Sequence, residues 1–388
     1  MVGECRATLP APPGRPRGRS VSEADVGESY ASPVTLTGPV EVVGTGLLGT
    51  SVALACRKAG LDVLLTDVAP EHVRTASGLG AGRAKQPGDR PQLVVVAVPP
   101  DHLGPVITRV LDETAGTGAV VTDVGSVKAG PLARVADHPD AARYVGSHPM
   151  AGSERSGPLA AHEALFEGRP WAITPHLASE DTAVELVEEL VRLTGAVPVW
   201  LTPDEHDRAV ARTSHVPHLM AALVAGRLAD APESYLNLSG QGVRDVTRVA
   251  AGDPALYGQI ITGNSVAVLD LLGEVREQLD AAIAAIGTGD RAGLEAILAH
   301  GNTGTRAIPG KHGGPARPMA SVWVTIADEP GQLAKLFTDA VETQVSVEDI
   351  RIDHDPARPV GLVELVVEET RADQLLDALE SRGWKTHR

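Results

Sequence analysis

Short apolar runs alternate with helix-length stretches from residue 40 onward. Five of these runs have the length and composition of buried strands: VEVVG (40–44), LDVLLTD (61–67), LVVVAVP (93–99), AVVTDV (119–124) and YVGSHP (144–149). This rhythm is typical of βαβ units, which form a parallel sheet. The segment 183–195 carries valines at helical spacing and stops at Gly195, so we expect a further helix that covers the sheet. The pattern predicts an α/β domain over residues 36–200.

The pattern changes after PVWL (198–201), because strand-like runs disappear and Ala-rich helical stretches occupy residues 204–299. We therefore expect a second, all-helical domain over residues 201–300. Part of it, 264–286, carries apolar residues at spacings of three and four: Val268, Leu272, Val275, Leu279, Ile283 and Ile286. Such a stripe could pack inside one subunit or against a second copy, and spacing alone leaves both open. Our prediction is a homodimer.

Residues 301–318 hold five glycines and three prolines without a hydrophobic period, so we expect a linker there. Beyond it, SVWVTIAD (321–328) alternates as a strand does, and a helix follows from Gln332. Two more strands, VSVEDIRID and VGLVELVVE, precede a last helix, ADQLLDALESRG. This order, βαββα with a short end, predicts a small ferredoxin-like α+β domain over residues 319–388.

Composition and charge exclude several classes of partner. The formal net charge is −16, whereas a phosphate backbone requires a clustered excess of Lys and Arg, so we expect no nucleic acid. No apolar window has signal-peptide or transmembrane length, and we expect a cytoplasmic protein without a membrane partner. Cys5 and Cys56 are the only cysteines, which fits a reducing compartment. Residues 1–35, rich in Pro, Gly, Arg and Ser, are expected to be a disordered extension.

A glycine-rich turn follows the first predicted strand. In VVGTGLLGTSVALACRKAG, Gly44, Gly46 and Gly49 lie between that strand and a predicted helix, and Asp67 ends the next strand. This is the Rossmann-type dinucleotide fingerprint, in which the pyrophosphate lies on the helix N-terminus and the acid accepts hydrogen bonds from the ribose. A glycine turn without a ligand is the alternative. We expect these residues to contact the cofactor: Gly44, Gly46, Leu47, Leu48, Gly49, Asp67 and Val98.

Asp67 also bears on the choice of cofactor. Its charge would repel a 2′-phosphate, and the residues directly after it offer no cation, Arg74 being the nearest. The expected cofactor is therefore NAD rather than NADP.

Polar motifs follow two later strands, TDVGSVK (122–128) and GSHPMAGSERSG (146–157). Open α/β sheets bind their ligands at this end of the strands. The helical region adds three more motifs: PDEHD (203–207), TSHVPHL (213–219) and SGQGVRDVTRVAAGDPALYGQI (239–260).

Over nearly all of residues 38–300 these motifs, in the same order, resemble the prephenate and arogenate dehydrogenase family. The terminal module resembles an ACT domain, with DEPGQL (328–333) similar to the loop that starts its first helix. The resemblance implies oxidation of a cyclohexadienyl alcohol at C4, with hydride transfer to NAD and loss of the ring carboxylate as carbon dioxide. By analogy, the ACT-like module implies tyrosine as a feedback ligand.

The resemblance also implies roles for individual residues. His148 matches the catalytic histidine, and histidine suits proton transfer because its ordinary pKa of roughly 6.5 lies near working pH. Ser126 would reach that histidine or the substrate hydroxyl, although a turn serine is the alternative. The implied substrate-binding residues are Arg248, His218, Glu154, Tyr257 and Gln241. Arg248 would hold a carboxylate with two charge-assisted bonds.

Some of these assignments compete with structural roles. Tyr257 could equally be a core aromatic, and Arg244, four residues before Arg248, is expected to pair with an acid such as Asp245. The segment GQGVRD (240–245) departs from the family pattern, which tends to show three glycines and an aromatic before Arg-Asp. Specificity for the substrate side chain is therefore open.

A histidine zinc site is the alternative reading of the helical motifs, since His215 and His218 share a helix face and His206 could converge on them. No HExxH pattern or cysteine pair supports such a site, so we expect no metal.

Three functions compete. The main prediction is a prephenate dehydrogenase that yields 4-hydroxyphenylpyruvate, with arogenate or 4-amino-4-deoxyprephenate as alternative substrates. A catalytically silent sensor of NAD and an amino acid is a hypothesis of another class. A β-hydroxyacid dehydrogenase would need a catalytic Lys on the helices after the first domain, and residues 201–300 contain no Lys.

Overall fold

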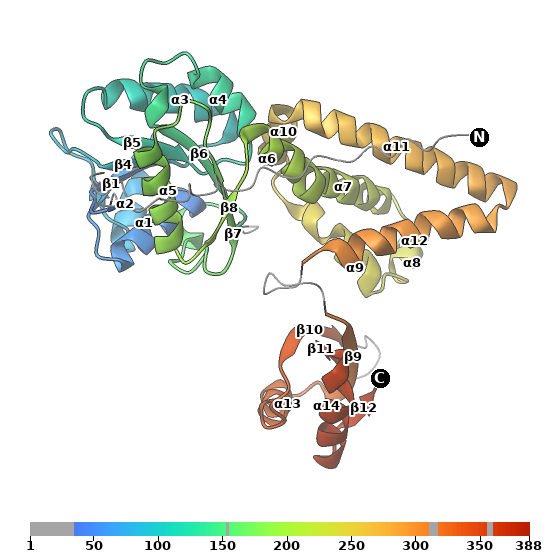
Figure 1. Cartoon of the computed structure of the whole chain (residues 1–388). Coiled ribbons are helices and arrows are strands. Elements are labelled where there is room, and N and C mark those ends of the chain that lie inside the picture. Colours follow the sequence, from blue (N-terminus) through green and yellow to red (C-terminus); the bar gives the residue numbers. More distant parts are fainter. Residues whose placement is uncertain (1–34, 153–154, 310–316, 355–359) are drawn as a thin grey trace, which may run out of the picture.

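The computed structural model describes residues 35–152, 155–309, 317–354 and 360–388 (Figure 1). The extension expected over residues 1–35 lies, except for its last residue, outside the described residues. The described chain forms an α/β domain, a helical domain and a small unit with its own sheet, in the order expected from the sequence.

The first domain is built on an eight-stranded sheet with the order β3-β2-β1-β4-β5-β6-β7-β8. Its strands are β1 (Val40–Val43), β2 (Val63–Thr66), β3 (Arg83–Ala84), β4 (Leu93–Val96), β5 (Val120–Asp123), β6 (Tyr144–Pro149), β7 (Pro170–Thr174) and β8 (Val197–Trp200). All five strands expected from apolar runs are present. The first six strands have the order of a Rossmann-type sheet, which binds a dinucleotide at the carboxyl ends of its strands.

The five strands expected from apolar runs are parallel to one another. The sheet then continues with two strands in the opposite direction, since β8 is parallel to β7 and β7 runs antiparallel to β6. Strands β6 and β7 are joined without a helical crossover of the kind that a parallel connection requires; the only regular element described between them is the short 3-10 helix η2 (Pro158–Ala160). The pairing brings Trp171 opposite Pro149 and Ala172 opposite His148. The antiparallel strand β7 therefore supports the end of β6, where Ser147, His148 and Pro149 form the SHP motif.

Helices cover both faces of this sheet. They are α1 (Leu47–Lys58), α2 (Pro70–Gly78), α3 (Pro100–Glu113), α4 (Ala129–Val135) and α5 (Asp181–Leu193). Side chains of α1 and α5 belong to one apolar cluster, and those of α3 and α4 to another. Strands β1, β4 and β5 are buried throughout, as expected for a sheet covered on both faces. The expected glycine stop of α5 is confirmed, since Gly195 has φ +76 just beyond the helix.

The helical domain contains α6 (Pro203–Val210), a π-helical turn η3 (Ala211–His215), α7 (Val216–Ala229), α8 (Glu233–Leu236), α9 (Gln241–Thr247), the 3-10 helix η4 (Arg248–Ala251), α10 (Pro254–Gly263), α11 (Ser265–Thr288) and α12 (Arg291–Ala307). Among the described residues no single helix is both long and apolar enough to cross a membrane. Helices α10 and α11 meet that measure only together, and they are bent by 93° at their junction.

The expected linker starts too early, because α12 continues to Ala307. Extending an existing helix adds one hydrogen bond for each residue fixed, so helix continues through a segment without an apolar period. The hydroxyls of Thr303 and Thr305 donate to the carbonyls four residues earlier. The rest of the expected linker lies mostly in 310–316, outside the described residues.

The apolar stripe of α11 is divided between two environments. Val268 is buried, and Leu272 and Val275 pack against the same small cluster as Val216 of α7. Farther along the helix, Leu279, Ile283 and Ile286 are 58%, 58% and 66% exposed. The amino-terminal half of the stripe therefore packs inside the subunit, while the carboxyl-terminal half is uncovered in the single chain.

The last unit contains β9 (Met319–Ala327), α13 (Gln332–Val341), β10 (Val347–His354), β11 (Val360–Glu368), α14 (Glu369–Ser381) and β12 (Lys385–His387). The expected βαββα order is present, and the short end forms the additional strand β12. The sheet has the order β10-β11-β9-β12 and is antiparallel throughout. Leu336 of α13 and Leu375 and Leu379 of α14 pack in one cluster with the buried face of the sheet.

Candidate active site

The glycine turn after β1 has a different constraint at each glycine. Gly44 has φ +99, and a Cβ there would lie 2.3 Å from the Ala97 carbonyl oxygen of the neighbouring β4 end. A Cβ on Gly49 would lie 1.9 Å from the Gly44 oxygen, so α1 packs on the turn only without a side chain there. Gly46 has no atom within 4 Å of its would-be Cβ. The open position is the one where a pyrophosphate would approach the backbone.

Helix α1 begins directly at this turn. No side chain caps its amino terminus, and no acidic residue lies in its first turn. The first N–H groups of a helix have no partner within the helix, and they carry the positive end of its dipole. Leu47 and Leu48 are partly buried against the core, and Val98 lies against Gly44. These residues therefore place an anion-binding helix end beside the strand ends.

The carboxylate of Asp67 is tied to the turn by residues that the sequence pattern did not indicate. Its Oδ2 accepts hydrogen bonds from the Thr45 N–H at 2.6 Å and from the Thr45 hydroxyl at 2.9 Å. Its Oδ1 accepts from the Ala69 N–H at 2.8 Å. A carboxylate has about four lone-pair positions, so capacity remains for a ribose hydroxyl. The residue after Asp67 is Val68, which is fully exposed, so this position holds an apolar side chain rather than a cation.

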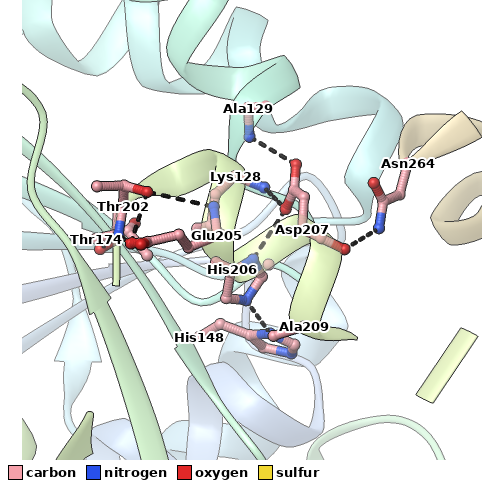
Figure 2. Close-up of polar contacts among 12 residues, drawn as sticks. Lys128, Ala129, His148, Thr174, Thr202, Glu205, His206, Asp207, Ala209 and Asn264 are labelled. Carbon is pink, nitrogen blue, oxygen red and sulfur yellow. Dashed lines mark hydrogen bonds and ion pairs between the residues drawn. The ribbon is translucent and has the colours of Figure 1, made fainter. Parts of the chain in front are cut away.

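His148 lies at the end of β6 and contacts a second histidine from the helical domain (Figure 2). Its Nδ1 is 2.9 Å from His206 Nε2, and His206 Nδ1 is 2.8 Å from Asp207 Oδ1. Asp207 also accepts the backbone N–H groups of Lys128 and Ala129, at 2.8 and 2.9 Å. One carboxylate thus joins the TDVGSVK motif to PDEHD and, through His206, to the SHP motif.

Local sequence explains why His206 and Asp207 face the sheet. Thr202 caps α6, its hydroxyl accepting the Glu205 N–H while the Glu205 carboxylate accepts the Thr202 N–H (Figure 2). This capping box sets the start of the helix, with Pro203 in its first turn. His206 and Asp207 then fall one turn later, both buried against the first domain.

A buried polar cluster lies beneath His148. The ammonium of Lys128 bonds to the Asp123 carboxylate and donates to the Ser147 carbonyl at 2.7 Å, and the Tyr144 hydroxyl donates to Asp123 at 2.8 Å. Lys128 and Asp123 are almost fully buried. A buried charge is tolerated when it is paired and hydrogen-bonded, as both groups are here. The cluster therefore holds the backbone on which His148 stands.

Burial and neighbouring cations keep the histidines neutral. Burial lowers the pKa of His148 well below its usual value, and His206, Lys128 and His215 lower it further. Burial also lowers the pKa of His206, although its hydrogen bond to Asp207 acts in the opposite direction. Burial opposes ionisation of Asp207, but hydrogen bonds from His206, Ala129 and Lys128 outweigh it, and the pKa of that carboxyl is lowered. The result is a neutral base beside a buried anion.

The π-helical turn brings a third histidine into the network. Asn264 Nδ2 donates to the Asp207 carbonyl at 2.7 Å and lies 3.2 Å from His215 Nδ1. Burial lowers the pKa of His215 to about 4. A π turn is uncommon and is often found at functional sites, because it changes which residues face inward. Pro217 stands in the first turn of α7, directly after the π turn, so the helix type changes between His215 and His218.

His218 forms part of a separate aromatic wall. Its ring stacks on Tyr257 with centroids 3.4 Å apart and an angle of 6° between the planes. Gly252 lies against both rings, since a Cβ there would be 2.7 Å from Tyr257 and 3.0 Å from His218. The buried Nδ1 of His218 has no hydrogen-bond partner among the described residues. A buried polar atom without a partner is costly, which indicates a place for a ligand group.

The remaining predicted site residues are placed less centrally. Arg248 begins η4, the short helix that ends at Gly252, and it is exposed with no ion pair among the described residues. Gln241 is exposed on α9, and its amide donates to Asp245 at 2.8 Å. The expected pairing of Arg244 with Asp245 is not present in the part of the chain described. Ser126 is partly buried in the DVGSVK loop, and Glu154 lies outside the described residues.

Sequence reasoning missed several residues of this site. Thr45, Lys128, Asp207 and Asn264 were not singled out, and His206 was considered only as a metal ligand. The available signal was adjacency, because Lys128 ends TDVGSVK and Asp207 ends PDEHD. The three histidines of the zinc alternative have different partners here, and no group of three or more possible ligands gathers among the described residues.

Two glycine substitutions separate packing from cofactor binding. Gly49→Ala should lower the melting temperature and weaken NAD binding, because its Cβ would overlap the Gly44 carbonyl. Gly46→Ala meets no protein atom, so it should keep the melting temperature and raise the Kd for NAD by about tenfold or more, roughly 1.4 kcal/mol. Thermal unfolding and fluorescence titration measure both effects. Unchanged NAD affinity in Gly46→Ala would contradict this placement of the cofactor.

Comparisons with known proteins agree with this geometry. Residues 52–207 match the family model described as prephenate dehydrogenase, nucleotide-binding domain, and residues 202–300 match prephenate dehydrogenase, dimerization domain. The chain is 36% identical to a probable prephenate dehydrogenase, NovF, of Streptomyces niveus, over 88% of this chain and 98% of that protein. It is 28% identical to a prephenate dehydrogenase of Bacillus subtilis, over 87% of this chain and 95% of that protein.

Solved structures show the same relationship. A prephenate dehydrogenase of Aquifex aeolicus, in complex with hydroxyphenyl propionate and NAD+, is similar with a TM-score of 0.63 and 26% identity, over 69% of this chain and 96% of that one. An arogenate dehydrogenase of Synechocystis gives a TM-score of 0.58 and 27% identity, over 69% of this chain and 98% of that one. The chain belongs to the prephenate dehydrogenase family.

Proposed function

We propose that this protein is an NAD-dependent prephenate dehydrogenase, which converts prephenate to 4-hydroxyphenylpyruvate and carbon dioxide. The observation that carries the proposal is the hydrogen-bonded His148 at the end of β6. It lies at the same edge of the sheet as a glycine turn shaped for a dinucleotide. The relatives that match most of the chain have names that fit this reaction. An NAD+ complex is known for the Aquifex aeolicus enzyme.

The reaction requires three groups to act on one ring. His148 accepts the proton of the 4-hydroxyl, which it can do because burial keeps its imidazole neutral. NAD, held by the glycine turn and the start of α1, would supply the acceptor for the hydride from C4. The electron pair of the bond to the ring carboxylate then enters the ring, which becomes aromatic as carbon dioxide leaves. Ser126, in the loop after β5, lies at the same edge of the sheet and would hold the hydroxyl.

Positive charge for the substrate carboxylates must be local in a chain with a net charge of −16. Arg248 is the proposed clamp, because its short helix ends against the His218–Tyr257 stack. The unpartnered Nδ1 of His218 is a second candidate contact on that wall. A guanidinium can form two parallel bonds to a carboxylate, which makes it suited to fix the ring.

The direct experiment measures NADH formation from prephenate and from arogenate in parallel, and NADPH formation with NADP. Turnover of prephenate with NAD, and weak turnover with NADP because of Asp67, is the expected result. Preference for arogenate would move the assignment to the reaction named for the Synechocystis structure. No turnover of either dienol would leave the alternative of a sensor that binds NAD and an amino acid.

His148→Asn is the catalytic control in that assay. It should lower kcat by about 100- to 10,000-fold, since the amide cannot accept the proton. The melting temperature should change little, because the replaced ring is partly exposed at a strand end. Full turnover in this variant would exclude His148 as the proton acceptor.

The clamp has its own test. Arg248→Gln should raise the KM for prephenate by about 10- to 100-fold, the range expected for losing hydrogen bonds to a charged group, with a smaller change in kcat. Arg244→Gln, an exposed arginine one turn earlier, is the matched control and should leave KM unchanged. Equal KM values in the wild type and Arg248→Gln would refute the clamp.

We also propose that the functional form is a homodimer. The uncovered half of the α11 stripe supports this, and so does the match of residues 202–300 to a domain described as a dimerization domain. Two other apolar residues of the helix, Val266 and Leu269, are also exposed, but helical spacing places them on other sides of α11 than the stripe. An apolar strip of this length is typical of a surface that another chain covers.

Charge on the stripe tests the dimer. The double variant Leu279→Glu and Ile283→Glu should give the mass of one chain, 40.2 kDa, in light scattering, where the wild type gives twice that mass. Leu177→Glu changes a leucine that is fully exposed on the first domain and should leave the dimer intact. A variant with the wild-type mass would show that the dimer, if present, uses another surface.

The terminal unit is proposed to be an ACT-like regulatory domain that responds to tyrosine. Its element order βαββαβ and its strand order β10-β11-β9-β12 support the ferredoxin-like topology expected for such a domain. The DEPGQL segment leads into α13 through Gly331, which has φ +91. Repeating the prephenate assay with added tyrosine examines this proposal together with the reaction.

A further inference from the structure

We propose that Asp207 and His206 are positioning residues, which act by determining the ring nitrogen of His148 that carries its proton. The inference rests on the proposed role of His148 as proton acceptor. The three side chains form one continuous line of hydrogen bonds, from Asp207 Oδ1 to His206 Nδ1 and from His206 Nε2 to His148 Nδ1 (Figure 2). His206 and Asp207 come from α6, whereas His148 ends β6.

The direction of these hydrogen bonds follows from the anion at one end. The Asp207 carboxylate accepts three N–H groups, two from the backbone and one from His206. An ionised carboxylate has no proton to donate, so Nδ1 of His206 carries the proton between them. A neutral His206 then has a bare Nε2, which can only accept.

The same argument continues to the next ring. Because Nε2 of His206 accepts, Nδ1 of His148 must donate, and a neutral His148 is left with a bare Nε2. That nitrogen is the only proton acceptor in the ring. The line of hydrogen bonds thus selects the tautomer of His148 that can accept a proton, at the nitrogen opposite His206.

The line of hydrogen bonds also stabilises the positive charge that forms on His148 during the reaction. As the O–H bond of the substrate breaks, its electron pair stays on oxygen and its proton forms a new N–H bond at Nε2 of His148. The positive charge on His148 then faces Nε2 of His206 through the existing Nδ1–H bond, with the Asp207 anion beyond it. When the product phenolate forms, it takes the same proton back, so His148 returns to its starting state and no net proton is released.

Other charged groups near this line are also held in place. Lys128, Asp123 and His215 face the two histidines from the first domain and from the π turn. Lys128 is paired with Asp123, and Asn264 holds both His215 and the Asp207 carbonyl. Asp207 is 5% exposed, and His206 has no exposed surface. The His206–Asp207 part of the line is therefore enclosed by protein, while His148 at the end of β6 remains partly exposed.

The kinetic test compares two substitutions at one position. His206→Leu removes the acceptor for His148 Nδ1–H, and kcat should fall by about 100-fold or more while KM and the Kd for NAD stay within about twofold. His206→Gln places an amide near the position of Nε2, and its carbonyl can accept that N–H. The glutamine variant should therefore recover most of the lost kcat. Equal losses in the two variants would overturn the proposal.

The tautomer itself can be observed without substrate. Proton–nitrogen correlation spectra of the NAD-bound full chain, labelled with isotopic nitrogen at histidine, should show His148 protonated at Nδ1. The signal is assigned by its absence in His148→Asn. In Asp207→Asn the side-chain amide can donate to His206, which would reverse both rings and place the His148 proton on Nε2, with a loss of kcat. Wild-type protein with the proton on Nε2 would overturn the proposal.

These readouts separate the two ideas. If the wild type turns over neither prephenate nor arogenate but His148 shows the Nδ1 proton, the proposed function fails and the tautomer selection stands. If prephenate is consumed but the His206 variants lose the same activity, the function stands and the positioning role fails. His387→Leu, an exposed histidine in the terminal sheet, is the matched control and should leave kcat unchanged. Melting temperatures of all variants identify any that fail to fold, and the glutamine and leucine pair remains decisive if Asp207→Asn does.

Discussion

The carboxylate of Asp207 is the contact on which the arrangement of this site depends. It accepts two backbone N–H groups from the start of α4 and the ring N–H of its neighbour His206, while its own carbonyl accepts from Asn264. These partners belong to the sheet domain, to α6 and to the junction of α10 and α11. Placing a buried anion between two domains is costly unless every lone pair is used, and here most are. The hydrogen bonds that satisfy Asp207 therefore also determine how the two domains meet.

A second group of buried charges, the ion pair of Lys128 and Asp123, stabilises the same edge of the sheet. Lys128 and Asp123 lie under the strand end with Tyr144, and burial lowers the pKa of Lys128 and raises that of Tyr144. Their contacts extend to the Ser147 carbonyl, directly before His148. The histidine is thus held from below by a paired cation and from the side by His206. A base held in this way has one orientation and one neutral form, which is what proton abstraction from a bound alcohol needs.

The glycine turn after β1 is held in another way, because its close backbone contacts depend on the absence of side chains. Gly44 and Gly49 allow the strand, the turn and α1 to approach within distances that a methyl group would prevent. Thr45 then brings the Asp67 carboxylate onto the turn through two hydrogen bonds, so the proposed ribose contact is oriented by the same loop that would receive the pyrophosphate. The proposed contacts with the ribose and with the pyrophosphate therefore depend on the same hydrogen bonds.

The sequence by itself determined the features that depend on local spacing. The five apolar runs, the glycine turn, the Asp at the end of β2 and the motif with His148 could all be read from the chain, because strand length, turn chemistry and strand-end position are local properties. The βαββα order of the last unit was readable for the same reason. Helix continuation to Ala307 was not, because propagation needs no apolar period.

Only the tertiary structure decided which polar residues meet. His206 and His148 are 58 residues apart, and Lys128 and Asp207 are 79 apart, so no spacing rule relates them. The antiparallel β7 and the π turn at Ala211–His215 likewise depend on packing rather than on propensity. A sequence states which groups are available for chemistry. Their hydrogen-bond partners, and with them the protonation of His148, are set by burial in the folded chain, since only there does an unpaired polar group become costly.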